Sequence, residues 1–568
     1  MLLPTPALAP TSDSGGPGAR LAGGAVAFGR LGDARDPAPR RQGRTRIALF
    51  GDFSGRAARG LIDTGAALAA RRGARLDIDT LDDVIARFRM VLPLTLGAGG
   101  ESVDIELGSI DDLHPDELYA ACPLFAELST LRQRLKSGAG VDQAIATMRG
   151  WAEGLAEGLA DALPTLPIAS RGASVPADRG LDDFASLIGA PADTRPVAPS
   201  PIEEILRRAV GPHVIAAPDP RAESMIAAVD AALSSSMRMI LHHPEFQAVE
   251  AAWRALDMIA RRVETDSDVE ITLFDISAEE WASDLAAAED LSESGLYSLL
   301  ATQPATDAAG AFSAVFALYS FEETPTHAAL LARMGKIAAR INAPFIAAMD
   351  STVADTAMTD RHAASATHWD ALRGQAEAAW LGLAAPRIMA RQPYGKRSDP
   401  IDAFAFEEFT TGDGLSGLAW MNPAAMVLTL LAQSAALGDG RIALGQVTTL
   451  DDLPYHVVTD AHGDQQALPV TDRLMTEAAH EALIGRGLIP IIGIRGTPEA
   501  RLGSFQSLGH EALRGPWSAH LPPRPAGPPP PTLDAATLAE TLSPRSGPSA
   551  SPGPGGMAPD LDALLRGG

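Results

Sequence analysis

The run Phe312–Tyr319 constrains the fold of this chain most strongly, because it is a strand candidate with apolar side chains on both faces. A strand of that kind has to be covered by other elements on both sides, which is typical of a central strand in a parallel sheet. Further strand candidates are Val269–Asp275, Pro344–Ala348 and Leu488–Ile494, with helical patterns such as Thr326–Arg340 between them. Strands that alternate with helices predict an α/β architecture.

The first part of the chain shows a similar alternation of strand and helix patterns. Its strand candidates are Ile47–Phe50, Leu76–Asp79 and Val103–Leu107, and its helix candidates are Leu81–Phe88, Asp116–Lys136 and Val141–Leu159. The run Val103–Leu107 alternates apolar and acidic residues, which is the pattern of a half-buried strand. We therefore predict that this part of the chain forms a globular unit of its own.

The composition of the chain predicts two globular units and three less ordered regions. With 568 residues, the chain exceeds a single ordinary core. We assign residues 1–43 to a flexible Pro/Gly/Ala-rich arm, 44–160 to the first unit, 161–220 to a linker, 221–521 to the second unit and 522–568 to a disordered Pro-rich tail. The expected fold class is α/β, with two units that a partly flexible linker joins.

The charge and the cysteine content exclude several functions. The 46 basic and 71 acidic side chains give a formal net charge of −25, which repels nucleic-acid phosphates and anionic lipids. Cys122 is the single cysteine, so an internal disulfide and a cysteine-based metal site are excluded, and a buried apolar role is favoured over a reactive thiol. No signal peptide is convincing, and no apolar run approaches the ~20 residues that span a bilayer. We expect a cytoplasmic protein that binds no nucleic acid and inserts into no membrane.

Motifs for chemistry are weak. The turn Gly51–Arg56 follows a strand, but no Gly-Lys-Ser/Thr follows it to hold phosphates. His242 and His243 are adjacent, so on a helix they point about 100° apart and form no i,i+4 metal pair. The turn Asp460–Asp464 could gather three polar ligands, although a hairpin turn requires Asp and Gly anyway. We therefore expect no enzyme activity, no catalytic residue, no metal and no cofactor.

A first set of motifs lies within residues 44–160. It opens with Arg46–Arg56, which reads Arg-Ile-Ala-Leu-Phe-Gly-Asp-Phe-Ser-Gly-Arg. The motifs that follow are Asp82–Ile85, Val103–Leu107, Ile110–Pro115 and Leu124–Leu135. Together they resemble, in order, the small (TssB-like) sheath protein of the type VI secretion system, whose opening is a strand followed by Gly-Asp-Phe-Ser/Thr-Gly-Arg.

A second set of motifs begins at Ile240–Arg254, which reads Ile-Leu-His-His-Pro-Glu-Phe-Gln-Ala-Val-Glu-Ala-Ala-Trp-Arg. The later motifs are Ala343–Ala348, Ala385–Gly395, Phe404–Glu408, Asn422–Ala424, Thr471–Arg473, Gly487–Pro490 and Phe505–Leu508. They resemble, in family order, the large (TssC-like) sheath protein of the same system. After Phe505–Leu508 that family normally continues into strands that pair with neighbouring subunits. Here a Pro-rich tail follows, so we expect part of this strand pairing to be missing.

We interpret the residues of these motifs as determinants of the fold. Pro244, for example, ends one helix and begins the next, with Glu245 near the positive helix end. The motif residues singled out are Gly51, Asp52, Phe53, Gly55, His242, His243, Pro244, Phe246, Trp253, Arg254, Pro344, Pro386, Tyr394 and Gly395.

The resemblance implies a fused small–large sheath heterodimer that assembles around an inner tube and helps to drive effector translocation. The partners that it implies are other sheath subunits, the inner-tube protein, baseplate proteins and the AAA+ unfoldase ATPase of the system. The alternative is a non-contractile accessory, cap, baseplate or scaffold protein with the same fold. Microscopy of the purified protein separates the two, because contractile tubes support the first and discrete particles the second.

The linker contains a short amphipathic segment with a helical spacing of apolar residues. The residues that we predict to bind a partner are Ile202, Glu203, Ile205, Leu206 and Ala209. The apolar ones follow i, i+3, i+4, i+7, as recognition of a helix in a groove requires. The resemblance implies that this segment is the helix that the ATPase engages after contraction, while packing on the helix from Arg221 is the alternative. A similar island, Asp560–Leu565, has no assigned role.

Overall fold

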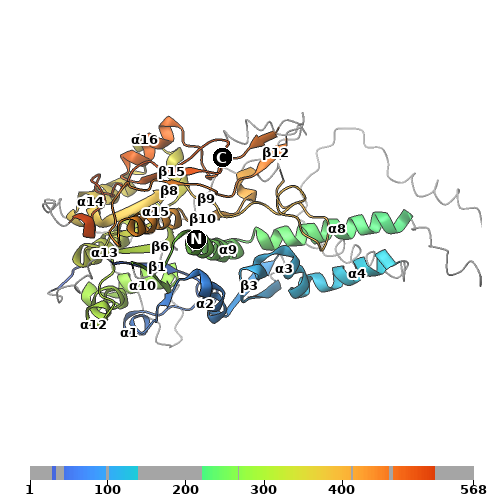
Figure 1. Cartoon of the computed structure of the whole chain (residues 1–568), viewed down its shortest axis with the longest axis horizontal. Helices are drawn as coiled ribbons and strands as arrows, with labels where there is room; N and C mark the ends of the chain where they lie inside the picture. The colour runs from blue at the N-terminus through green and yellow to red at the C-terminus, as the bar shows by residue number, and fades with distance from the viewer. Residues whose placement is uncertain are drawn as a thin grey trace, which may run out of the picture. The chain divides into compact units, whose positions relative to one another are not determined.

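The computed structural model describes residues 28–32, 44–96, 101–137, 220–265, 268–410, 414–459 and 465–518 (Figure 1). The chain divides into two compact units. The larger unit contains Met1–Phe125 and Ser234–Gly568, and the smaller one contains Ala126–Leu233. Each unit is described by itself.

A nine-stranded mixed sheet is the framework of the described part of the larger unit. Its strands, from edge to edge, are β11 (Thr449–Leu450), β15 (Ala500–Leu502), β14 (Ile489–Gly493), β8 (Leu381–Ala385), β7 (Phe345–Met349), β6 (Ala314–Phe321), β1 (Thr45–Gly51), β5 (Val269–Asp275) and β2 (Ala74–Arg75). The strands from β14 to β5 are parallel to their neighbours, whereas β2, β15 and β11 pair antiparallel. This order confirms an α/β fold with a parallel centre.

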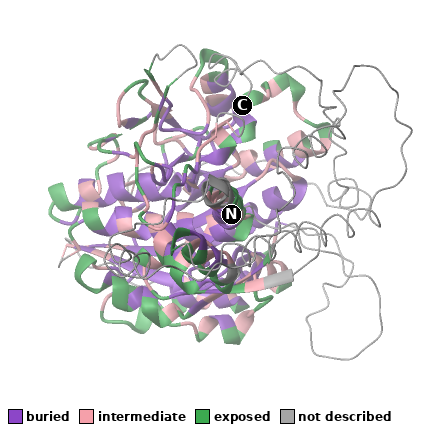
Figure 2. Ribbon diagram, turned by 90° about the vertical axis from the view of Figure 1, so that its right-hand side faces the viewer, coloured by how far each residue is buried: buried purple, intermediate pink, exposed green. Residues whose placement is uncertain are grey.

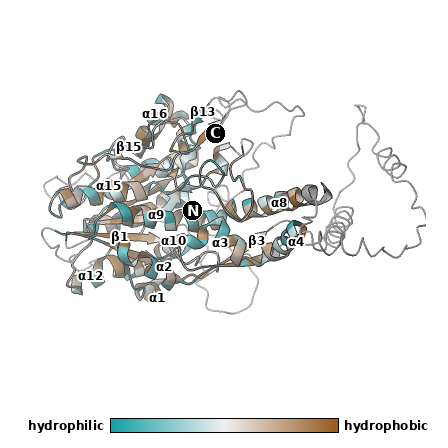
Figure 3. Ribbon diagram, turned by 45° about the vertical axis from the view of Figure 1, so that its right-hand side comes forward, coloured by the Kyte–Doolittle hydropathy of each residue, from teal (hydrophilic) through white to brown (hydrophobic). Residues whose placement is uncertain are grey.

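The strand β1 lies inside this sheet, between β5 and β6. Ile47 is in register with Ile271 of β5 on one side and with Ala314 of β6 on the other. Because Ile47–Gly51 is entirely buried, both faces of the strand have to be covered. Figure 2 shows buried residues on the elements in the interior of the molecule, and Figure 3 labels β1 in a view coloured by hydropathy. The structure therefore differs from the prediction of two separate α/β units, since the two predicted parts share one sheet.

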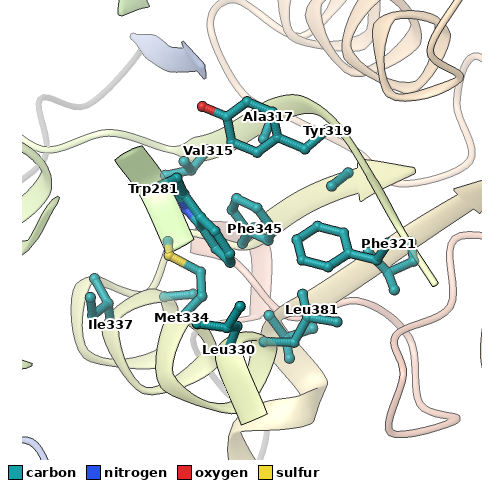
Figure 4. Packing of buried hydrophobic residues seen from close by; sticks show 14 of the residues in the cluster. Trp281, Val315, Ala317, Tyr319, Phe321, Leu330, Met334, Ile337, Phe345 and Leu381 are labelled. Carbon is teal, nitrogen blue, oxygen red and sulfur yellow. The ribbon is translucent and has the colours of Figure 1, made fainter. Parts of the chain in front are cut away.

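One face of the sheet is covered by α10 (Ala278–Ala287), α13 (Pro325–Ile341) and α14 (Ala363–Gly374). Figure 4 shows Trp281 of α10 packed among strand and α13 side chains. The Trp281 ring stacks on Phe345 with centroids 5.6 Å apart and meets Phe321 edge-on at 5.5 Å. Aromatic side chains of this size contribute most to the apolar surface that such a core buries.

The opposite face is covered by α15 (Ala424–Leu437), which contacts β5, β6, β7 and β8. Beside α15 lies α9 (Pro244–Arg262). The strand side chains Leu49, Phe316 and Ile346 are fully buried, yet they are absent from the core around Trp281. Because strand side chains alternate between faces, these residues face the α15 side.

The remaining elements connect or flank the sheet. The helices are α1 (Gly65–Ala69), α2 (Leu81–Phe88), α3 (Pro115–Ala121), α11 (Gly295–Tyr297), α12 (Gln303–Thr306) and α16 (Glu477–Gly485). The two-stranded sheets are β3 (Met90–Leu96) with β4 (Glu101–Leu107), β9 (Ile388–Met389) with β10 (Trp420–Met421), and β12 (Val457–Thr459) with β13 (Gln465–Ala467). Short turns of helix are η1 (Ile78–Thr80), η2 (Asp111–Leu113), η3 (Pro123–Phe125), η6 (Leu291–Glu293), η7 (Ser298–Thr302), η8 (Ser351–Asp355), η9 (Met358–Asp360), η10 (Ala376–Trp380), η11 (Gly414–Gly417) and η12 (Pro516–Ser518).

The described part of the smaller unit consists of α4 (Ala126–Ser137) and the portion of α8 (Pro220–Leu241) up to Leu233. An ion pair links the two helices, with 2.6 Å between Arg132 Nε and Asp230 Oδ1. The apolar side chains buried here are Leu131, Leu135, Val229 and Leu233. Each helix therefore buries apolar side chains, and the ion pair joins the two helices.

Two sequence predictions differ from the structure locally. The predicted helix Asp116–Lys136 is interrupted, because Pro123 lacks a backbone N–H and disfavours helical geometry in the residue before it. The predicted strand Leu76–Asp79 is misplaced, since β2 covers Ala74–Arg75 and η1 begins at Ile78. Leu76 N–H still donates to the Ile271 carbonyl at 2.9 Å, so the pairing with β5 stops there. In η1 the Asp77 carboxylate accepts a hydrogen bond from the Asp79 N–H, which favours a turn.

Several predicted segments lie outside the described residues. They are the helix Val141–Leu159, the linker segment that contains Ile202–Ala209, the turn Asp460–Asp464 and the tail island Asp560–Leu565. Within the predicted arm 1–43, the structure describes residues 28–32, and Phe28 is buried there. For these residues the prediction of a flexible arm does not hold.

Candidate assembly site

The loop that follows β1 has a shape that its own sequence requires. A Cβ at Gly51 would lie 2.6 Å from the Phe53 ring, and Gly55 has φ +69°, which favours glycine. The Asp52 carboxylate closes the loop by accepting hydrogen bonds from the N–H groups of Arg56 and Ala57, at 2.6 and 2.9 Å. The loop thus presents its backbone in one conformation at the carboxyl end of β1.

The second part of the chain binds this loop through two side chains. Asp275, the last residue of β5, accepts hydrogen bonds from Phe53 N–H at 2.9 Å and from Ser54 Oγ at 2.7 Å. From α9, the buried Trp253 donates its indole N–H to the Phe53 carbonyl at 2.9 Å. Backbone groups of the loop after β1 therefore find partners 200 or more residues away in the sequence.

A buried glutamate of α10 binds two arginines that precede the linker, in residues 44–160, which we call the first segment. Glu280 has no exposed surface, and Arg56 contacts both of its oxygens, with Nε to Oε2 at 2.9 Å and Nη2 to Oε1 at 2.7 Å. Arg71 Nη2 lies 3.0 Å from Glu280 Oε1, and Asp63 Oδ2 accepts from both arginines at 2.8 and 2.7 Å. Bidentate pairs of this kind are stronger and more specific than single contacts.

The buried acids of this region titrate differently. Burial alone would raise the pKa of Glu280, but hydrogen bonds from Arg56 and Arg71 outweigh it and hold that pKa below the usual value. Burial raises the pKa of Asp52 to about 6, although two backbone N–H groups oppose the shift. Burial likewise raises the pKa of Asp275, against its hydrogen bonds from Ser54 and Phe53. Below we call this region, made of Asp52–Arg56, Arg71, Trp253, Asp275 and Glu280, the seam.

A second contact between the two segments lies at the start of α3. The Asp116 carboxylate accepts hydrogen bonds from the N–H groups of Asp402 and Ala403, at 3.0 and 2.9 Å. His114, which caps α3 by accepting from Asp116 N–H, places its ring edge-on to Tyr394 with centroids 5.1 Å apart. The first segment is thus held at both the sheet and the 402–403 loop.

Three motifs of the second set meet around a buried arginine. Arg391 Nε lies 2.6 Å from Glu250 Oε1, and its Nη1 lies 2.6 Å from Glu408 Oε2. The guanidinium also covers the Tyr394 ring at 4.1 Å, and the Tyr394 hydroxyl accepts from Arg254 at 3.1 Å. Burial would raise the pKa of Glu408, but the charge of Arg391 outweighs it and the pKa falls to about 2. We call this group the Arg391 cluster.

The other motif residues lie at joints of the fold. His243 Nδ1 accepts from Glu245 N–H at 3.3 Å and caps α9, in which Pro244 is the first residue. His242 Nε2 lies 3.7 Å from Glu408 Oε1. Phe246 is buried, and the Pro344 carbonyl accepts a hydrogen bond from Val315 N–H at 2.8 Å. Pro386 follows a cis peptide bond. At Gly395, a Cβ would lie 2.3 Å from Glu407 Oε2, so the chain is closely packed there.

Sequence reasoning missed the acids that hold these regions together. Glu280 is the N3 residue of a capping box with Ser277, and that pattern could have marked it as a helix start. Asp284 accepts from the N–H groups of Gly65 and Leu296, at 2.6 and 2.9 Å, and no local pattern indicates this role. Asp275 is visible in the sequence only as the end of a strand.

The residues predicted to bind a partner, Ile202, Glu203, Ile205, Leu206 and Ala209, lie outside the described residues, as does Asp460–Asp464. Within the described ranges, no group of three or more His, Cys, Asp or Glu side chains could hold a metal ion. In the same part of the chain, no helix is long and apolar enough to cross a membrane.

Comparisons with known proteins match the second segment. Residues 223–509 match the VipB family, described as EvpB/VC_A0108, tail sheath N-terminal domain. The type VI secretion system sheath protein TssC1 of Pseudomonas aeruginosa is 30% identical over 308 residues, which make up 50% of this chain and 61% of that protein. This chain therefore spans less than two thirds of that relative. The strand β1 and its loop lie before the residues matched to the family.

Proposed function

The chain belongs to the VipB tail-sheath family, and from this premise we propose that it is a cytoplasmic structural subunit of a type VI secretion sheath. In this proposal, residues 44–160 take the place of a small sheath subunit and are fused to the large-subunit segment. The fused subunit assembles with other sheath subunits around an inner tube and helps to drive effector translocation.

The observation that carries the proposal is the position of β1. This strand lies outside residues 223–509, which match the family and which we call the family segment. In the sheet, however, β1 lies between β5 and β6 of that segment. Without it, both neighbours would expose a full row of unpaired backbone groups, which is costly in a buried sheet. The family segment thus needs a strand from elsewhere, and here the first segment supplies it.

The seam supports the same proposal. Its bonds use the Gly-Asp-Phe-Ser-Gly-Arg loop on one side and Trp253, Asp275 and Glu280 on the other. A loop that is shaped by its own glycines and bound through backbone groups is suited to joining two parts of a subunit. Among the described residues of the larger unit, Glu280 of the seam is paired with Arg56, and Glu250 and Glu408 of the cluster are paired with Arg391. Asp52 and Asp275 accept hydrogen bonds from N–H groups and from Ser54. Carboxylates that are used in this way favour a structural role over an enzymatic one.

Baseplate proteins and a AAA+ ATPase complete the proposed set of partners. The segment that contains Ile205 and Leu206 would be the ATPase docking element, because its apolar spacing suits a groove on a partner. The acidic net charge of −25 is consistent with partners that are proteins and not nucleic acids.

Cleavage of the linker tests the fusion. A protease site inserted at residues 194–200 should yield two halves that elute together in gel filtration, because β1 remains in the sheet. A chain that carries the inserted site but is not cut serves as the control. Two stable halves that elute separately would show that the first segment is not a sheath partner of the second.

Assembly is tested by negative-stain microscopy of the uncut chain with and without the products of neighbouring genes. Tubes that contain this chain support the sheath role. Discrete particles under all conditions would support the non-contractile alternative.

A further inference from the structure

Three arginines of the family segment lie around two carboxylates beside α14 and α16. The five side chains are Glu323, Arg361, Asp370, Arg373 and Arg486. Glu323 joins two of the arginines, since Arg361 Nε contacts its Oε1 and Arg486 Nε lies 3.1 Å from its Oε2. Asp370 joins Arg361 to Arg373, because its Oδ1 lies 3.0 Å and 3.5 Å from the two Nη1 atoms.

The contacts close into a ring. Arg373 Nη2 donates to the Gly485 carbonyl at 2.9 Å, and Gly485 is the last residue of α16, directly before Arg486. Arg486 Nη1 donates to the Ala482 carbonyl at 3.1 Å, which holds this guanidinium on the last turn of the helix. The five side chains therefore occupy one place in the fold, and we call them the arginine ring.

Each arginine of the ring has an N–H group to spare. Within the described part of the chain, Arg361 Nη2, Arg373 Nε and Arg486 Nη2 are buried and have no hydrogen-bond partner. The side chains of Arg361 and Arg486 are only 5% and 3% exposed. A buried donor without an acceptor is costly, so native proteins seldom keep one unless a water molecule or an ion accepts from it. Three such donors in one ring indicate a ligand that offers several acceptors.

The charge of the ring points to an anion. Three guanidinium groups carry +3 and two carboxylates carry −2, which leaves a net charge of +1 on these five side chains. Burial lowers the pKa of Arg373, and the charges of Arg361 and Arg486 also lower it, against the opposing charges of Asp370 and Glu323. A bound anion would supply both the missing negative charge and the missing acceptors.

We propose that the arginine ring binds a small tetrahedral oxyanion of the phosphate and sulfate class. Guanidinium groups suit the oxygens of such ions, because they present several N–H donors in a fixed plane. Donors from three separate side chains favour a tetrahedral ion, whose oxygens point in different directions, over a carboxylate, whose two oxygens share one plane. The Asp370 side chain is 59% exposed, so an ion would enter the ring beside it. This site is independent of the proposed sheath assembly.

Calorimetric titration of the full chain tests the site. Sodium phosphate, sodium sulfate and sodium acetate are titrated separately at constant ionic strength, with sodium chloride as the compensating salt. Phosphate and sulfate should each bind saturably to one site per chain, and acetate should bind at least about tenfold more weakly. Acetate that binds as tightly as phosphate would overturn the assignment to a tetrahedral oxyanion. Saturable binding of neither phosphate nor sulfate would overturn the site.

Two substitutions should change the phosphate affinity in opposite directions. Arg373→Gln removes a donor and a positive charge and should weaken binding at least about tenfold. Asp370→Asn removes the negative charge beside the entry and should strengthen binding at least about threefold, because the charge of the ring rises from +1 to +2. The matched control is Asp307→Asn, which removes a similarly exposed carboxylate that pairs with Arg46 at 3.2 Å. It should stay within about twofold of wild type, since Asp307 is not a member of the ring.

The Asp370→Asn result decides the proposal even if Arg373→Gln folds poorly, because a carboxylate with a purely structural role would not weaken anion binding. A phosphate affinity that Asp370→Asn leaves equal to that of the Asp307→Asn control would overturn the site. Thermal melts give an independent readout, since an ion that binds only the folded chain raises its melting temperature. Phosphate should raise that temperature more for Asp370→Asn than for Asp307→Asn. An equal rise in both would be the general effect of excluded salts and would contradict a specific site.

Discussion

The Arg391 cluster and the seam are two buried polar regions of the same unit that balance charge in different ways. In the cluster, one buried guanidinium lies 2.6 Å from a carboxylate oxygen of each of two glutamates. In the seam, Glu280 is matched by Arg56 and Arg71, but Asp52 and Asp275 depend mainly on N–H groups and Ser54. Of the two carboxylates, Asp52 of the seam should therefore respond to pH near neutrality and Glu408 of the cluster should not. Burial raises the pKa of Asp52 to about 6, whereas the charge of Arg391 outweighs burial and lowers the pKa of Glu408 to about 2.

The regions also differ in what they join. The Arg391 cluster connects motifs that all belong to the family segment. Replacing Arg391 should therefore lower the free energy of unfolding of that segment as a whole. The seam connects the family segment to residues 51–71, so weakening it should also loosen the hold on the first segment. The predictions below test this distinction.

Replacing Arg391 with Met should have the largest effect. Glu250 and Glu408 would lose the guanidinium that lies 2.6 Å from each of them and would keep only the longer contacts with Arg254 at 3.8 Å and His242 at 3.7 Å. The free energy of unfolding should therefore fall by about 4 kcal/mol. Chemical denaturation at pH 7 measures it. The control is Arg261→Met, which removes an exposed arginine with an i,i+4 partner and should change stability by less than about 0.5 kcal/mol. Equal stability of the two variants would contradict the role given to the cluster.

Replacing Glu280 with Gln should have an intermediate effect that is specific to the seam. Arg56 and Arg71 would lose their shared carboxylate, which should lower the free energy of unfolding by roughly 2–3 kcal/mol. In the linker-cleaved protein, the same change should let the halves separate at concentrations where the wild-type halves stay together. Glu293→Gln, at an exposed position, is the matched control. If the halves of the Glu280→Gln protein remain as tightly joined as those of the control, the seam is not what holds them.

The pH dependence should be smaller. Because the pKa of Asp52 rises from 3.8 to about 6 on folding, protonated Asp52 stabilises the folded state. Its contribution is full below pH 3.8 and disappears as the pH rises through about 6. Between pH 5 and pH 7.5 this amounts to a loss of roughly 1.4 kcal/mol. The loss should be absent from Asp52→Asn, measured by denaturation at both pH values.

Two comparisons make the pH test specific. Asp275 also has a raised pKa, so Asp275→Asn should reduce the remaining dependence in the same direction. Glu408→Gln lowers stability overall. In a His242→Gln background, which removes the imidazole 3.7 Å from Glu408, it should leave the slope between pH 5 and pH 7.5 unchanged, since the pKa of Glu408 is about 2. A slope that Glu408→Gln removes and Asp52→Asn retains would reverse the comparison between the two regions.

The smallest effect on stability is expected in the linker. Replacing Ile205 and Leu206 with Asp should abolish binding of a labelled 196–215 peptide to the cognate ATPase, because the apolar stripe is lost. The same change in the intact chain should leave the melting temperature nearly unchanged, because the segment is long enough for only two or three helical turns, which are marginal in water by themselves. A fall of several degrees would mean that the stripe packs into a core and is not a docking element.

Local patterns predicted many elements well. The strand Val269–Asp275 and the helix Leu81–Phe88 have the predicted bounds, and the predicted strand at Ile47–Phe50 lies within β1. These segments have strong periodicity or a run of β-branched and aromatic residues, signals that depend on near neighbours. β8, with the sequence Leu-Gly-Leu-Ala-Ala, was missed because glycine and alanine are common in other structures too.

The candidate site was predicted only in part. The glycines and Asp52 of the loop after β1 stand out in the sequence, and the structure places them at a joint. Glu280 and Arg391 did not stand out, because the residues that pair with these buried charges are far away in the chain and no local pattern indicates them. Arg391, for example, finds Glu250 only after two distant helix and loop segments pack together.

Local patterns were sufficient to predict α/β structure with a central buried strand, and the motifs pointed to the tail-sheath family. That β1 and the family segment share one sheet became visible only in the folded chain. The sequence of an apolar strand such as Ile47–Phe50 predicts that both of its faces are covered. It does not predict which strands lie beside it. Pairing between parallel strands is made by backbone groups that every residue possesses, so the choice of β5 and β6 as neighbours depends on packing over the whole unit.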